Sequence, residues 1–171
     1  MCVKSNIDLT LENLEKIANI IIAILTLVLA FYVFVYQKQK DKRDRKVQWL
    51  KDLIIVPKLD EIEIFYNGIS NLKLEIKTND LNEIEKIRII NKVKKFASEF
   101  RKNFIASLQH LAPLLFTNIQ ENIDKLTDDL TNAITNDELK LCNEKTYNRE
   151  IYAKIQSSYS SVLKQIFEYQ G

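Results

Sequence analysis

Glycine and proline are almost absent from this chain, which contains 2 of each among 171 residues. Strand-rich folds need these residues far more often, because glycine adopts positive φ angles in tight turns and proline presets the turn geometry. The scarcity therefore argues against a fold built from hairpins and sheets. It predicts an all-α protein.

Residues that commonly carry catalysis are also scarce. His110 is the single histidine, which excludes a multi-histidine metal site and leaves little for acid–base chemistry. Gly68 stands alone in a helical pattern, so there is no glycine-rich phosphate loop. We expect His110 to be a structural residue near a helix end. We also expect no catalytic residues, no metal site and no cofactor: the protein is predicted not to be an enzyme.

Three weaker catalytic candidates give the same expectation. Eight residues separate Arg101 from His110, which is too long for the arginine–histidine motif of HEPN ribonucleases. Cys142 has no evident basic partner, and we expect a half-buried structural thiol rather than a nucleophile. An acidic group lacks the Glu-x-x-His pairs of ferritin-like sites and is predicted to be a solvated helix face. Its members are Glu121, Asp124, Asp128 and Asp129.

One long apolar segment dominates the first quarter of the chain. No charged residue occurs from Ile17 to Gln37, and about 20 helical residues span roughly 30 Å, the thickness of the hydrocarbon layer. A cleavable signal peptide needs a basic segment before the run and small residues after it. Here the residues before the run are slightly acidic, and the residues after it are bulky. Core helices of soluble proteins are rarely apolar all round. We predict a transmembrane helix over residues 17–37.

Basic residues follow this segment and set its predicted orientation. They are Lys38, Lys40, Lys42, Arg43, Arg45 and Lys46. Cationic loops stay on the cytoplasmic side, so residues 1–16 should be a short extracytoplasmic N-terminus and residues 38–57 a basic juxtamembrane stalk. These cations should also contact the anionic inner leaflet of the bilayer. No aromatic residue is interleaved among them, so we expect no nucleic acid partner.

This orientation makes the protein a single-pass inner-membrane protein with its N-terminus out and its C-terminus cytoplasmic. Cys2 and Cys142 then lie on opposite sides of the membrane, so no internal disulfide is expected.

Small and polar residues in the apolar segment line up on one helix face. Asn19, Ala23, Thr26 and Ala30 follow one another at spacings of four, three and four residues. Small residues let membrane helices approach closely, and asparagine and threonine can hydrogen-bond across the gap. We interpret this face as a candidate transmembrane association face for a homo-oligomer. The alternative is a chance spacing, with Asn19 hydrated near the outer interface.

Residues 58–171 carry four helical stripes and are predicted to form a cytoplasmic antiparallel four-helix bundle with coiled-coil-like packing. Pro57 should end or kink the stalk helix, and Pro113 should stop the second helix of the bundle. Capping signals are predicted at Asp80 with Glu83 and at Thr117 with Gln120. The stripes are Leu59, Ile62, Phe65, Ile69, Leu72 and Ile76; Ile84, Ile87, Ile90, Val93, Ala97, Phe100, Phe104, Leu108 and Leu111; Ile119, Ile123, Leu126, Leu130 and Ile134; and Tyr147, Ile151, Ile155, Tyr159, Val162, Ile166 and Tyr169.

The layout "IANIIIAILTLVLAFYVFVY" followed by "KQKDKRDRKVQWLKDLIIVPKL" resembles that of small single-pass, all-helical bacterial membrane proteins. Some of these accompany phage-defence or toxin-like systems. The residues themselves favour a cytoplasmic helical module for protein interaction or signal coupling, with a protein partner in the cytoplasm. The alternative is a membrane-disrupting effector that oligomerises through its transmembrane helix.

Overall fold

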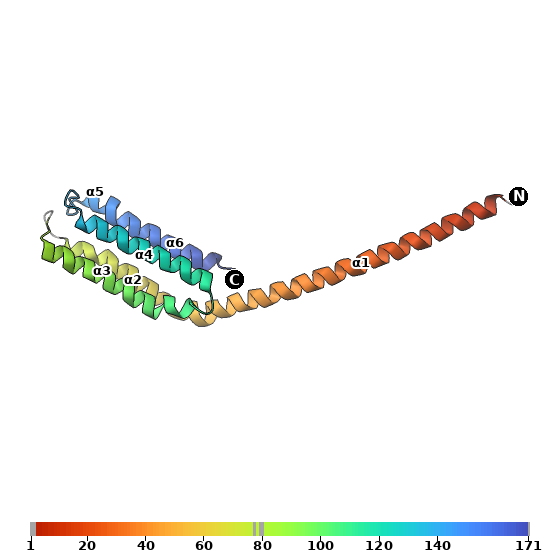
Figure 1. The fold of residues 1–171 in the computed structure, drawn as a ribbon, viewed down its shortest axis with the longest axis horizontal. Coiled ribbons are helices and arrows are strands. Elements are labelled where there is room, and N and C mark those ends of the chain that lie inside the picture. Colours follow the sequence, from red (N-terminus) through yellow and green to blue (C-terminus); the bar gives the residue numbers. More distant parts are fainter. Residues whose placement is uncertain (1–2, 77, 79–80, 171) are drawn as a thin grey trace. The chain divides into compact units, whose positions relative to one another are not determined.

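The computed structural model describes residues 3–76, 78 and 81–170, with side chains from Lys16 onward (Figure 1). Every regular element in this described part is helical, and none of its residues lies in a strand. The all-α prediction is therefore confirmed. The chain divides into two compact units, Met1–Arg45 and Lys46–Gly171, which we call the N-terminal unit and the C-terminal unit.

Helix α1 runs from Val3 to Leu50, a single helix of 48 residues. It continues into a π-helical turn, Lys51–Ile55, and a 3-10 turn, Val56–Lys58, before α2 begins. Pro57 lies at the start of the 3-10 turn, where its missing N–H breaks no helical hydrogen bond. The predicted break at Pro57 is thus a change of helix type between α1 and α2.

The C-terminal unit contains all the remaining helices. They are α2 (Leu59–Ser70), α3 (Glu83–Asn103), α4 (Pro113–Thr135), the short α5 (Glu144–Tyr147) and α6 (Ala153–Glu168). The connecting turns Asn71–Glu75 and Ile105–Leu108 are 3-10 helical, and a π-helical turn, Asn148–Tyr152, joins α5 to α6.

Four of these helices share one hydrophobic core. Helix α2 contacts α3, α3 contacts α4, α4 contacts α6, and α6 contacts α2. The core begins before the boundary predicted at residue 58, because Leu50 and Ile55 are both buried in it. A π-helical turn brings residues five apart onto one side, which lets both side chains face inward.

Aromatic rings fill the centre of this core. Phe65 of α2 stacks on Phe100 of α3 with ring centroids 4.7 Å apart, and Phe100 stacks in turn on Phe104 at 5.2 Å. Tyr66 meets Phe65 and Tyr159 edge to face, at 4.8 Å and 4.9 Å. Offset stacks and edge-to-face contacts of this kind add about 0.5–1.5 kcal/mol each to the burial of the rings.

A glycine allows α2 and α3 to approach closely. A Cβ atom on Gly68 would lie 2.7 Å from Cε1 of Phe96. The absence of a side chain at Gly68 therefore makes room for the Phe96 ring. Gly68 has a packing role in α2, which agrees with its isolated position in a helical pattern.

The predicted stripe of α3 is wrong in its first turns. Ile84 and Ile87 are 81% and 56% exposed, whereas Lys86 and Ile89 are buried. The isoleucines in this part of α3 lie on two different faces of the helix. The face that contains the buried Val93 also contains Ile89 and Lys86, four and seven residues earlier. Lys86 tolerates this position because its Nζ donates to Glu83 Oε1 at 2.9 Å and to Asp137 Oδ1.

The predicted helix starts also need correction. Asp80 lies outside the described residues, and α3 begins instead after Asn82, whose side chain forms a reciprocal capping box with Glu85. Pro113 does not stop a helix: α3 ends at Asn103, and Pro113 begins α4. Thr117 is thus inside α4, where its hydroxyl donates to the Pro113 carbonyl at 3.0 Å.

Candidate functional site

The apolar segment of α1 is exposed along its whole described length. All large apolar side chains from Ile17 to Tyr36 have exposed fractions of at least 36%. One stretch of 18 residues has a mean hydropathy of 2.7, and none of it is buried inside the structure. By length and composition this helix can cross a membrane. The core helix of a soluble protein, which would be mostly buried, and a signal sequence near the N-terminus pass the same test.

The predicted association face lies within this segment of α1. Asn19, Ala23, Thr26 and Ala30 are all exposed. The hydroxyl of Thr26 donates to the Ile22 carbonyl of its own helix at 2.8 Å. Such back-bonding satisfies the threonine within the helix. Among these four residues, the Asn19 amide is then the one side-chain donor that α1 itself does not use.

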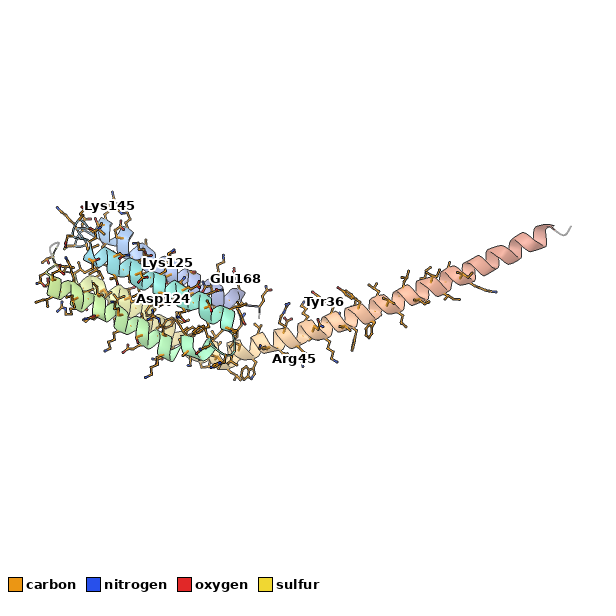
Figure 2. The ribbon with its side chains drawn as sticks, viewed as in Figure 1. Tyr36, Arg45, Asp124, Lys125, Lys145 and Glu168 are labelled. Carbon is orange, nitrogen blue, oxygen red and sulfur yellow. The ribbon has the colours of Figure 1, made fainter. Side chains whose placement is uncertain are left out.

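The six predicted lipid contacts also lie on the surface. Lys38, Lys40, Lys42, Arg43, Arg45 and Lys46 are exposed. Arg45, labelled in Figure 2, donates through Nε to the Asp41 carbonyl at 3.2 Å. No ion pair in the described part of the chain involves these six cations. Their charges are therefore available to anionic groups in the surroundings.

A chain of polar side chains crosses the interior of the C-terminal unit. The Tyr66 hydroxyl and Ser158 Oγ are 2.7 Å apart, and Ser158 Oγ donates to Asn122 Oδ1 at 2.5 Å. Ser158 has one proton and gives it to Asn122, so Tyr66 is the donor in the first bond. Burial raises the pKa of Tyr66 well above its usual value, which keeps the hydroxyl protonated for this role.

A second buried tyrosine is the last residue of α5. Tyr147 is 2% exposed, and burial raises the pKa of its hydroxyl to about 12. The ammonium group of Lys73 lies 5.6 Å from the centre of the Tyr147 ring and 3.4 Å from Glu144 Oε1. These contacts join the turn after α2 to α5 and have no evident chemical function beyond packing.

The weaker catalytic candidates do not come together. His110 is exposed in the turn before α4, and no hydrogen bond or ion pair links its side chain to another described residue. Arg101 pairs with Asp124 across α3 and α4 instead. Cys142 is exposed, so the prediction of a half-buried thiol is wrong. Among the described residues no group of three or more His, Cys, Asp or Glu side chains is placed to hold a metal ion.

The sequence analysis missed a groove between α4 and α6. It has a volume of about 360 Å³ and is lined by Asn122, Lys125 and Asp129 of α4 and by Lys154, Ser157 and Ser161 of α6. Four serines within five residues of α6 were the available signal, and three of them, Ser157, Ser158 and Ser161, line the groove. Small polar residues on a helix face that packs against another helix leave space that larger side chains would fill.

Comparisons of the chain with protein-family models, with curated proteins and with solved structures give no match. The geometry and the sequence pattern are therefore the grounds for a functional proposal.

Proposed function

We propose that this is a single-pass inner-membrane protein whose C-terminal unit is a cytoplasmic antiparallel four-helix bundle that binds a protein partner at the membrane surface. The observation that carries the proposal is the exposure of α1 from Ile17 to Tyr36 together with its high hydropathy. Leaving one large apolar side chain in water costs about 1.5–3 kcal/mol relative to burying it. A bilayer around residues 17–37 removes this cost for the whole segment at once.

The basic residues after the segment support the proposed orientation. The stretch from Lys38 to Lys46 contains six exposed cations and two anionic residues, Asp41 and Asp44. Positive charge close to a membrane helix favours the cytoplasmic side, and each cation near an anionic surface contributes about 1 kcal/mol to lipid binding. The C-terminal unit is then cytoplasmic.

A role in protein interaction agrees with the chemistry of the C-terminal unit. Its described side chains hold no group of residues placed to bind a metal ion, and its buried Tyr66, Ser158 and Asn122 side chains bond to one another. Several large apolar side chains remain exposed on it, among them Trp49, Leu114 and Phe167. Exposed aromatic residues are common in the contact surfaces of protein complexes.

The test is to express the full chain with a C-terminal tag in bacteria, fractionate the cells and identify what co-purifies in mild detergent. We expect the chain in the membrane fraction after a high-pH carbonate wash, a tag that external protease cannot reach, and a defined stoichiometric partner. Recovery in the soluble fraction would contradict the membrane part. A membrane-bound chain that co-purifies with no partner would contradict the interaction part alone.

A second candidate function is membrane disruption by a bacterial effector that oligomerises through α1. The observation that favours it is the shared face of Asn19, Ala23, Thr26 and Ala30 on an exposed helix. In this case expression depolarises the membrane, and Asn19→Leu abolishes the effect because the amide no longer bonds between helices. Thr26→Val is the matched control, since the Thr26 hydroxyl already bonds to Ile22 within its own helix. Harmless expression of the wild-type chain excludes this candidate.

A further inference from the structure

The groove between α4 and α6 arises from short side chains on α6. Ala153, Ser157 and Ser161 follow one another at spacings of four residues and all line it. Residues four apart lie on the same face of a helix. Their small size leaves a trough of about 360 Å³ between two helices that are otherwise in contact.

The buried hydrogen-bond chain fixes the orientation of Asn122 at this groove. Ser158 is 7% exposed, and its hydroxyl donates to Asn122 Oδ1 at 2.5 Å. The carbonyl oxygen of Asn122 therefore faces Ser158, and its amide nitrogen carries two N–H donors. No hydrogen bond in the described part of the chain uses that nitrogen, so both donors are available at the groove.

Further donors surround the same space. Lys125 of α4, labelled in Figure 2, makes no ion pair with any described residue. Lys154 of α6 has only a long contact of 3.9 Å with Glu150. Ser161 accepts a hydrogen bond from Gln165 at 3.4 Å, which leaves its own proton to be donated.

The charge of the lining is also positive. The lining contains two ammonium groups, those of Lys125 and Lys154, and one carboxylate, that of Asp129. Leu126 and Ala153 supply apolar surface between these polar groups. Small-molecule sites typically combine apolar walls with a few polar groups that fix the orientation of the ligand, in volumes of about 300–1,000 Å³.

We propose that this groove binds a small organic anion. Its carboxylate or phosphate group accepts hydrogen bonds from the lysine ammonium groups, the Asn122 amide and the serine hydroxyls. Its apolar part lies against Leu126 and Ala153. The groove belongs wholly to the C-terminal unit, so this inference does not rest on the proposed function or on the membrane orientation.

The test is to titrate phenyl phosphate into the full-length protein in a non-ionic detergent and to measure binding by isothermal titration calorimetry. We expect saturable binding that weakens by about tenfold or more in the double variant Lys125→Met/Lys154→Met, because each lysine supplies a charge-assisted hydrogen bond. The matched control is Lys94→Met/Lys102→Met, which removes the same charge from exposed positions on α3, a helix that does not line the groove, and should bind like the wild type.

Three further probes define the ligand chemistry. Benzoate carries the anion as a carboxylate, inorganic phosphate lacks the apolar part, and phenol lacks the charge. We expect binding of phenyl phosphate or benzoate, with the stronger of the two naming the anion class, and weaker binding of inorganic phosphate and phenol. A variant that leaves the charge unchanged, Ser157→Leu, fills the groove and should abolish binding even where the lysine variants fold poorly.

The proposal is overturned if neither phenyl phosphate nor benzoate binds saturably at concentrations up to about 10 mM, a level at which even weak specific sites fill. It is also overturned if the Lys94/Lys102 control loses as much affinity as the groove variant, since the binding then reflects net charge alone. Binding that survives Ser157→Leu would place the ligand outside the groove.

Discussion

The hydroxyl of Tyr66 donates a 2.7 Å hydrogen bond to Ser158, a residue 92 positions further along the chain. This bond joins α2 to α6 inside the core, and Ser158 passes its own proton to Asn122 of α4. Three helices are thus tied by one polar chain in a largely apolar interior.

Tyr66→Phe is expected to lower the free energy of unfolding by about 1–2 kcal/mol, because the buried Ser158 oxygen loses its donor while Asn122 still accepts from Ser158. Urea denaturation followed by circular dichroism measures the loss. Ser158→Ala should cost at least as much, since it leaves both neighbours without a partner. In a double-mutant cycle the two changes should be less than additive, and additive effects would mean that the bond contributes nothing to stability.

Gly68→Ala tests the close approach of α2 and α3. Alanine in a helix interior is favoured over glycine by about 1 kcal/mol. The new Cβ would lie 2.7 Å from the Phe96 ring, so the ring must move and the gain should be reduced or reversed in the wild-type chain.

The control for this change is the Phe96→Leu background, in which the clash is relieved and Gly68→Ala should be stabilising. The thermal unfolding midpoints of the four proteins give the comparison. An equal shift in both backgrounds would show that Phe96 does not limit the residue at position 68.

Lys86 should make the free energy of unfolding decrease at alkaline pH. Its hydrogen bonds to Asp137 and Glu83 raise the pKa of the Lys86 ammonium above its ordinary value of 10.5. A raised pKa in the folded state means that the stabilisation is complete below the unfolded-state pKa and is lost as the pH rises through the folded-state pKa. The urea midpoint should therefore fall above about pH 10.5 in part because Lys86 deprotonates.

Lys86→Met keeps the buried stem of the side chain and removes the charge. Its urea midpoint should be lower than that of the wild type at neutral pH and should fall less at alkaline pH. Lys94→Met is the matched control, because the exposed Lys94 makes no ion pair with any described residue. If both variants show the same pH dependence, the ion pairs of Lys86 do not contribute.

The basic residues after the apolar segment should decide the membrane orientation. Replacing Lys38, Lys40, Lys42, Arg43, Arg45 and Lys46 by glutamine should expose a C-terminal tag to external protease in a substantial fraction of the molecules. The control replaces six lysines far from the segment, Lys94, Lys95, Lys102, Lys140, Lys145 and Lys164, and should keep the tag inside. An unchanged orientation in the first variant would show that another feature of the chain sets the topology.

The sequence by itself determined the features that depend on local composition. Scarce glycine and proline leave helices as the available structure, and the stripe from Ile119 to Ile134 needs no more than the helical period to place each of its members in the core. The uncharged run from Ile17 to Gln37 likewise makes a long apolar helix whatever surrounds it.

Only the tertiary structure decided the features that depend on residues distant in sequence. Lys86 is buried instead of Ile87 because Asp137, beyond the end of α4, supplies a carboxylate to its ammonium group. The groove and the polar chain beneath it exist because α6 presents small serines to α4 and Tyr66 reaches them from α2. Helical periodicity specifies which residues share a face, but the partner of that face is set by packing between helices.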